Sequence, residues 1–343
     1  MLGDKYRTIL LGSIFDSEYK SAMASAQPIA RNPERPPAGQ SGLSDGVIWE
    51  YFQTLRWPRG FICPGCGWHV SEEWTATQRR RHRVAGDSNV SSFSLLPRAR
   101  GRIVCPGCGK HVSLTSGTML AGIRTSPSKL MTAVGCFLRA VGGISAVQLK
   151  REAGLLNTLT AVRLITNFHK VALPDNRDKL RGTVHVDSGI ATLGSARRSK
   201  AFRVVVAVEE ADNGKAGKIA LLYSPEQTGI FWIPGFPQPI MRGTRVVARP
   251  GEIEGLLRAW NITPELVRGS DGKLLPLCAS VLVQVEAFLR KTHRGAISPS
   301  NVQLYLHALA FCWNHRDRRE QATHKLIRRL LQKPQVNPGL NAY

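Results

Sequence analysis

The segment GTVHVDSGIATL, residues 182–193, marks the point where the chain changes from a helical pattern to a strand pattern. Val184, Val186 and Ile190 are β-branched and predict a buried strand. Asp187 is expected at the end of this strand, where burying a carboxylate is costly unless it has a partner. Two interpretations stay open, a ligand in a metal-dependent nuclease-type site and an ordinary polar strand end.

Three more strand-like runs follow this segment, and helical patterns come after them. The runs are FRVVVAVEE (202–210), KIALLYSP (218–225) and TRVVARP (244–250). Helices are predicted over IEGLLRAW (253–260), VLVQVEAFLRK (281–291) and NVQLYLHALAFCWNHRDRR (301–319). Strands followed by helices indicate an α+β or α/β domain, here residues 179–335, with a usual domain size of about 150 residues.

The part of the chain before residue 179 has a helical pattern over residues 121–178. The pieces are SPSKLMTAVGCFLRAV (126–141), ISAVQLKREAG (144–154) and NTLTAVRLITNFHKVA (157–172). Gly154 and a short turn separate the last two pieces, a spacing that suits a helix-turn-helix. Both a DNA-reading motif and two adjacent amphipathic helices fit this pattern, because the motif itself specifies only the helix pair.

Two CPGC motifs predict a metal site between residues 44 and 120, after a short amphipathic helix. Their cysteines are Cys63, Cys66, Cys105 and Cys108. A tetrahedral Zn²⁺ takes four soft ligands, and each C-x-x-C turn supplies two thiolates. Gly67 and Gly109 follow the two turns and permit a positive φ there. The pattern therefore predicts a zinc ribbon with a structural zinc ion.

A basic insert separates the two cysteine pairs and lengthens their spacing to 38 residues. The common spacing is about 15 to 20 residues. The arginines predicted to contact DNA phosphates from this region are Arg79, Arg80, Arg81, Arg83, Arg98, Arg100 and Arg102. A solvated basic loop without fixed contacts is the alternative.

The charge balance predicts a polyanionic partner. Lys and Arg number 47 against 24 Asp and Glu, a formal net charge of +23, which is typical of nucleic-acid-binding proteins. No run of 18 apolar residues occurs, so no membrane span is expected. Four of the seven cysteines lie in the CPGC motifs, a usage that predicts a cytoplasmic protein. Residues 1–43, rich in Pro, Ser, Ala and Gly, are expected to form a disordered leader.

Several of these motifs together resemble a known family. LRWPRGFICPGCG, VCPGCGKHVSLTSGTML and GISAVQLKREAGL are similar to the N-terminal half of bacterial insertion-sequence transposases with a zinc ribbon and a DDE-type catalytic domain. HVDSGIATLG resembles the first-aspartate strand of that family, and VEAFLRK with HRGAISPSNVQLYLHALAFCWNHR resembles its last-acid and closing helices. The resemblance runs from about residue 49 to residue 319.

The resemblance implies an α+β multidomain protein with a zinc ribbon, a helix-turn-helix-like segment and an RNase H-like α/β domain. Such a protein binds double-stranded DNA at the element ends, as a homo-oligomer associated with the nucleoid. It cuts and joins the DNA by Mg²⁺-dependent phosphoryl transfer, in which carboxylates converge on two metal ions.

Carried over by motif, Asp187 is the first catalytic acid and Glu286 is the last. Arg249 stands where the second acid is expected, and Asp271 is the nearest replacement. An arginine beside Asp187 would pair with it instead of leaving it for metal. For Glu286 the alternative is an i,i+4 ion pair with Arg290. The chain is thus predicted to be a transposase or a catalytically inactive, transposase-derived DNA-binding protein.

Overall fold

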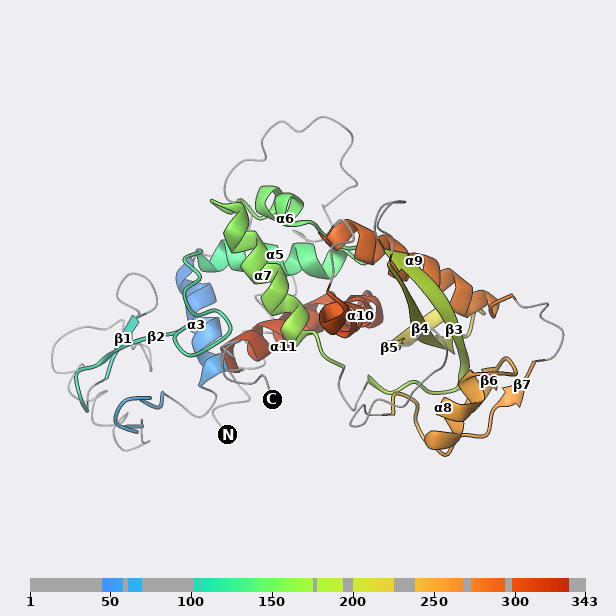
Figure 1. Ribbon diagram of the computed structural model, residues 1–343. Helices are drawn as coiled ribbons and strands as arrows, with labels where there is room; N and C mark the ends of the chain where they lie inside the picture. The colour runs from blue at the N-terminus through green and yellow to red at the C-terminus, as the bar shows by residue number, and fades with distance from the viewer. Residues whose placement is uncertain are drawn as a thin grey trace. The chain divides into compact units, whose positions relative to one another are not determined.

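The computed structural model is an α+β structure with eight helices and a mixed sheet in the part of the chain that it describes (Figure 1). The described residues are 45–57, 61–69, 102–105, 107–174, 178–193, 200–224, 238–267, 273–293 and 298–332. Two compact units are present, Met1–Thr132 with Ile327–Tyr343, and Ala133–Leu326. This division differs from the predicted boundaries at 120 and 178, since it groups the predicted helix pair with the sheet.

The first unit contains helix α3 (Asp45–Arg56) and a small hairpin of β1 (Arg102–Val104) and β2 (His111–Ser113). The predicted amphipathic helix is confirmed, because its apolar residues, among them Ile48 and Phe52, are buried. The guanidinium of Arg56, at the end of α3, donates hydrogen bonds to the carbonyls of Leu114 and Ser116. These bonds connect α3 to the segment that follows the hairpin.

Three helices confirm the helical pattern predicted before residue 179. They are α5 (Pro127–Arg139), α6 (Ala146–Glu152) and α7 (Thr158–Val171). Side-chain caps begin the last two: Ser145 Oγ accepts from the Gln148 N–H at 3.2 Å, and Asn157 Oδ1 accepts from the Thr160 N–H at 2.7 Å. Gly154, in the turn between them, has a φ of 61°, which favours glycine.

The second unit contains a five-stranded sheet in the order β5-β4-β3-β6-β7. The strands are β3 (Thr183–Leu193), β4 (Lys200–Glu210), β5 (Ala216–Ser224), β6 (Arg245–Ala248) and β7 (Glu265–Leu266). Strands β3, β4 and β5 pair antiparallel, whereas β6 is parallel to β3 and β7 is parallel to β6. The four predicted strands are confirmed, and β7 is too short to leave a pattern in the sequence.

Successive side chains of β3 point to opposite faces of the sheet, and a helix covers each face. Val184 and Val186 point into an apolar cluster that includes Leu257 of α8 (Ile253–Ala259). The intervening residues face α9 (Pro276–His293), where a Cβ on Gly189 would lie 2.4 Å from Leu282 Cδ2. Figure 1 shows α9 running along β3 and β4.

Two predictions about this unit were wrong. Ile190 is 55% exposed instead of buried, since β6 pairs with β3 only as far as Val186 and the layer beneath it ends there. The single helix predicted over 301–319 is two helices, α10 (Pro299–Asn314) and α11 (Arg319–Gln332). A turn, in which the Arg318 N–H donates to the His315 carbonyl at 3.0 Å, separates them.

Helix α10 covers the outer edge of β5 with two side-chain amides. Gln303 accepts from the Tyr223 N–H at 2.7 Å and donates to the Leu221 carbonyl at 3.0 Å. Asn314 does the same at Ile219, at 2.8 and 2.9 Å. The two amides replace the neighbouring strand that an edge strand lacks.

Candidate functional site

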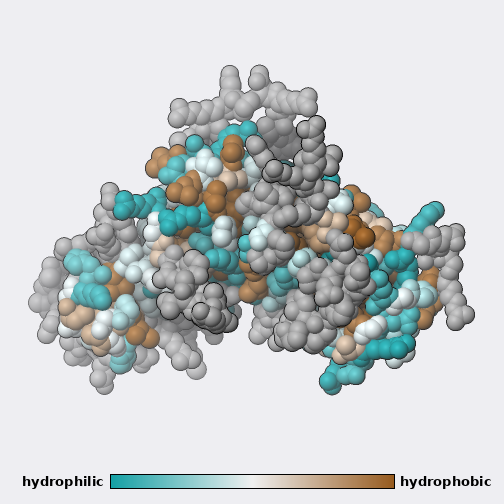
Figure 2. Space-filling model, viewed as in Figure 1, coloured by the Kyte–Doolittle hydropathy of each residue, from teal (hydrophilic) through white to brown (hydrophobic). Residues whose placement is uncertain are grey.

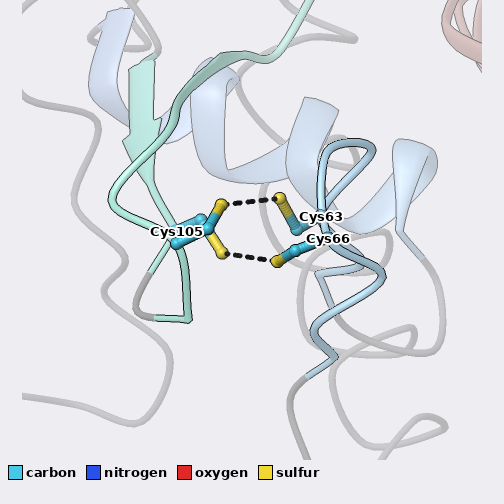
Figure 3. Close-up of side chains that lie close together, drawn as sticks. Cys63, Cys66 and Cys105 are labelled. Carbon is cyan, nitrogen blue, oxygen red and sulfur yellow. Dashed lines mark hydrogen bonds between the residues drawn. The ribbon is translucent and has the colours of Figure 1, made fainter.

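The two CPGC turns bring their cysteines into one cluster. The Sγ atoms of Cys63, Cys66, Cys105 and Cys108 all lie within 4.8 Å of one another. Cys66 Sγ lies 3.7 Å from Cys105 Sγ (Figure 3). Cys63 Sγ lies 3.8 Å from Cys108 Sγ. The four predicted metal ligands are therefore together, and they could hold a metal ion.

Both turns have the same backbone structure. The Gly67 N–H donates to the Cys63 carbonyl at 2.9 Å, and the Gly109 N–H donates to the Cys105 carbonyl at 2.8 Å. The two glycines have φ values of 71° and 68°, as the motif predicted. A small apolar cluster around Phe61 packs behind the sulfurs, so the cysteine turns also belong to the core of this module.

The thiols of the cluster differ in acidity. Desolvation raises the pKa of Cys63, but N–H groups of Cys66 and Gly65 and the neighbouring thiols lower it to about 6. For Cys66, the Trp68 N–H acts to lower the pKa, while Cys108, burial and the other thiols raise it to about 12. Thiolates, and not thiols, bind metal, so a bound cation must displace protons from this cluster.

One of the seven predicted DNA-contacting arginines lies within the described residues. Arg102 is the first residue of β1. The other six, at positions 79, 80, 81, 83, 98 and 100, lie outside the described residues. Contact between the basic insert and DNA stays a prediction.

Asp187 lies in the middle of β3 and not at its end, which corrects the expectation from the sequence. The residue is only 2% exposed. Arg249 donates from Nε to Asp187 Oδ2 at 2.7 Å and from Nη2 to Oδ1 at 2.8 Å. The backbone N–H groups of Leu275 and Ser188 donate to the same carboxylate at 2.9 and 2.7 Å. The predicted pairing of Asp187 with an adjacent arginine is confirmed.

These four bonds occupy the Asp187 carboxylate. An ionised carboxylate accepts about four hydrogen bonds, two at each oxygen. The bond to Asp187 also raises the pKa of Arg249 above its ordinary value, so the guanidinium stays charged. The guanidinium thus compensates the charge of the carboxylate, and a cation at Asp187 would have to displace Arg249.

Glu286 lies on α9, where it is half-buried. Its Oε1 accepts from the Thr192 N–H at 3.1 Å and from the Thr192 hydroxyl at 3.3 Å. The ion pair with Arg290, the alternative interpretation of Glu286, is not among the ion pairs of the described residues, and Glu286 binds Thr192 instead. Glu286 therefore caps a backbone N–H of β3 near the end of that strand.

The structure does not bring Asp187 and Glu286 together. Thr192, which binds Glu286, lies five residues beyond Asp187 on β3. Five residues of strand span about 16 Å, whereas the ions of a two-metal site lie about 4 Å apart. Asp271, the weak candidate for the second acid, lies outside the described residues. Asp187 and Glu286, as the structure places them, therefore do not fit one two-metal magnesium site.

Two partners of these acids were not predicted. One is the N–H of Leu275, the residue directly before α9. The signal in the sequence was Pro276, because a proline at the first helical position marks a helix start, where backbone N–H groups have no partner within the helix. The other is Thr192, for which the sequence carries no signal. Both come from tertiary contacts that span about ninety residues of chain, with separations of 88 and 94.

Comparison with protein-family models and with curated proteins found no match for this chain. None of the helices in the described ranges combines the length and the apolar character that a membrane span requires.

Proposed function

We propose that this protein is a double-stranded-DNA-binding protein derived from the insertion-sequence transposases, in which an internal ion pair replaces the catalytic metal site. The observation that carries this proposal is the bidentate contact of Arg249 with the buried Asp187, at 2.7 and 2.8 Å. The guanidinium stands where the resemblance expects a second acid. Asp187 then contributes to stability, since it joins β6 and the start of α9 to β3.

The sheet topology and the charge support this proposal. Strand β3 is central in the sheet. The pairing is antiparallel from β3 to β4 and β5 and parallel from β3 to β6 and β7. This arrangement is compatible with the RNase H-like core implied by the resemblance. The net charge of +23 favours a polyanion, and the α6–α7 pair has the order of a helix-turn-helix. In this proposal the domain acts as a scaffold for DNA binding.

We infer further that the four-cysteine cluster holds a structural Zn²⁺ ion. Four thiolates within 4.8 Å of one another suit tetrahedral zinc, and a closed set of four sulfurs leaves no position for substrate. The ion would hold the two cysteine turns together. Metal analysis of the purified chain is expected to find one zinc per chain, and Cys105→Ser is expected to lose it; full zinc content in that variant would contradict this site.

An active transposase is the second candidate. The position of Asp187 on the central strand, with α9 and its Glu286 alongside, favours it. It requires Arg249 to leave Asp187 when DNA and metal bind.

A cleavage assay separates the two candidates. Purified full-length protein is incubated with supercoiled plasmid and with linear duplexes, in Mg²⁺ or Mn²⁺, and binding is followed in parallel by mobility shift. The proposal expects duplex binding that weakens steeply with salt and no nicking. Metal-dependent nicking that persists on repurification and is lost in a folded Asp187→Asn variant would establish the active enzyme, and absence of duplex binding would overturn both candidates.

A further inference from the structure

The outward face of α7 has an unusual combination of residues for a solvent-exposed surface. Leu159 is 66% exposed and Val162 is 37% exposed, although both are apolar. At 3.6 residues per turn, Arg163, Thr166 and Lys170 share their side of the helix. The opposite side packs inward, with Leu164, Ile165 and Phe168 buried. The name "outer face" is used below for Leu159, Val162, Arg163, Thr166 and Lys170.

The outer face is rigid. Asn157 caps the start of α7, and the Phe168 ring lies 5.1 Å from that of Phe137 on α5. Farther along, the His169 ring packs 4.3 Å from that of Tyr305 on α10. The helix therefore presents its outer side chains from a fixed position, which a surface that reads a ligand requires.

Charge identifies the chemistry that fits this face. Helix α7 contains no acid, and Arg163 and Lys170 are exposed on the outer face. Between residues 127 and 171 the single acid is Glu152, whose Oε1 accepts from Gln148 Nε2 at 2.7 Å. Figure 2 shows brown and teal residues side by side over α6 and α7. An apolar strip flanked by positive charge, on a helix without acids, suits a groove lined with phosphates.

We infer that the outer face of α7 enters the major groove of double-stranded DNA and reads its base edges. This inference rests on the proposed DNA-binding function and deepens it. A helix about 10–12 Å across fits a groove about 12 Å wide. Leu159 and Val162 contact the methyl groups of thymine, Arg163 donates to O6 and N7 of guanine, and Lys170 contacts a phosphate. The second helix of a helix-turn-helix reads bases with its first turns, where Leu159 and Val162 lie.

The test begins with selection of a binding sequence from a random-sequence duplex library by the full-length protein. Thymines in the selected site are then replaced one at a time by deoxyuracil, which removes only a methyl group. The wild-type chain is expected to lose affinity about fourfold for each contacted methyl. A Leu159→Ala, Val162→Ala variant is expected to be insensitive to the same replacement. These exposed side chains contribute little to folding, and circular dichroism checks that the variant is folded.

Two further variants separate base reading from phosphate contact. Arg163→Ala is expected to weaken binding of the selected site about tenfold and to relax its preference at one position. Lys170→Ala is expected to weaken all duplexes equally and to reduce the salt dependence by about one charge. Arg258→Ala, at an exposed position on α8, is the matched control and should change neither property.

Each possible outcome bears on one claim. Duplex binding without sequence preference, or a thymine-methyl effect that is the same in wild type and variant, would overturn the inference and leave the proposed function standing. A change of oligomeric state in the Leu159→Ala, Val162→Ala variant, with unchanged DNA selection, would identify this face as a protein interface and would also overturn the inference. A chain that binds no duplex at all would overturn the proposed function itself.

Discussion

Asp187 and Arg249 form a buried ion pair whose contribution to stability depends on the presence of both partners. The carboxylate side chain is 3% exposed and the arginine side chain 21% exposed. Two charges taken out of water gain little net stability as a pair, but removal of one partner leaves the other uncompensated. The pair also anchors the N–H before α9, so its loss would loosen the contact between α9 and β3.

The first prediction concerns this pair. Arg249→Leu is expected to lower the free energy of unfolding by about 3–5 kcal/mol, because Asp187 becomes a buried charge without its counter-ion. Urea denaturation followed by circular dichroism measures the change. Arg245→Leu is the matched control, since Arg245 begins the strand that Arg249 directly follows, forms an exposed pair with Glu265 at 2.7 Å and should cost less than about 1 kcal/mol. Equal, small losses in the two variants would contradict the assignment.

The second prediction concerns His307 on α10. Burial lowers the pKa of His307 to about 4, below the value of about 6.5 for an unfolded histidine. The unfolded state therefore binds the proton first as the pH falls. The stability contributed by neutral His307 is complete above about pH 6.5 and decreases by about 3 kcal/mol as the pH falls to 4.

Denaturation curves between pH 7.5 and pH 4 test this prediction. The wild-type chain is compared with His307→Leu, which keeps a similar volume but cannot titrate. The difference between the two curves isolates this group from the carboxylates that also titrate in this range. Parallel curves for the two proteins would show that His307 does not contribute.

Side-chain amides of helix α10 cover the edge of the sheet at strand β5. Each of Gln303 and Asn314 satisfies one backbone N–H and one carbonyl of β5. Trp313 Nε1 and Arg316 extend this pattern at the Gly217 carbonyl, at 2.7 and 3.1 Å. An uncovered edge strand pairs readily with other chains, so these contacts protect the protein from association through β5.

The third prediction is that loss of these amides weakens and exposes the edge. Gln303→Ala and Asn314→Ala are each expected to cost about 1–3 kcal/mol, because two backbone groups lose their partners in a partly buried place. The double variant is expected to self-associate, which light scattering measures. Asn301→Ala, at an exposed position of the same helix, is the control. A double variant that stays as dispersed as the control would argue against edge protection.

The chain folds as two compact units, and the cysteine cluster belongs to the first. The apolar cluster around the two cysteine turns consists of five buried residues with two partly buried tryptophans, Trp57 and Trp68. A core of that size rarely folds without a metal ion or a disulfide. The sheet of the second unit has an apolar cluster of its own, with thirteen buried residues.

The fourth prediction follows from this division. Removal of metal with a strong chelator is expected to unfold the ribbon and to leave the sheet unit folded. Amide hydrogen exchange should become fast in residues 61–69 and 102–113 and stay slow in β3 and β4. Cys105→Ser should reproduce the pattern without chelator. Loss of protection in β3 and β4 at the same time would show that the two units do not fold independently.

The features that were predictable from the sequence are those that short stretches of chain specify. Each CPGC turn forms from consecutive residues, and the glycine after it has the positive φ that the turn requires. Side-chain periodicity located the four long strands and the helices α5 to α9, because burial on one face imposes a period of two or 3.6. The pairing of Asp187 with Arg249 was also predictable, since the two segments that carry them resemble a family pattern.

The remaining features depend on contacts between residues distant in the chain. Asp187 is held by residues 62 and 88 positions away, and Glu286 meets Thr192 across 94 positions. Ile190 is exposed because of where β6 stops, and α10 ends where its amides meet β5. The sequence alone thus determines the two cysteine turns, most of the secondary structure and the identity of the acids. Whether those acids can meet at one metal site depends on the packing of α9 and β6 against β3, which no local pattern encodes.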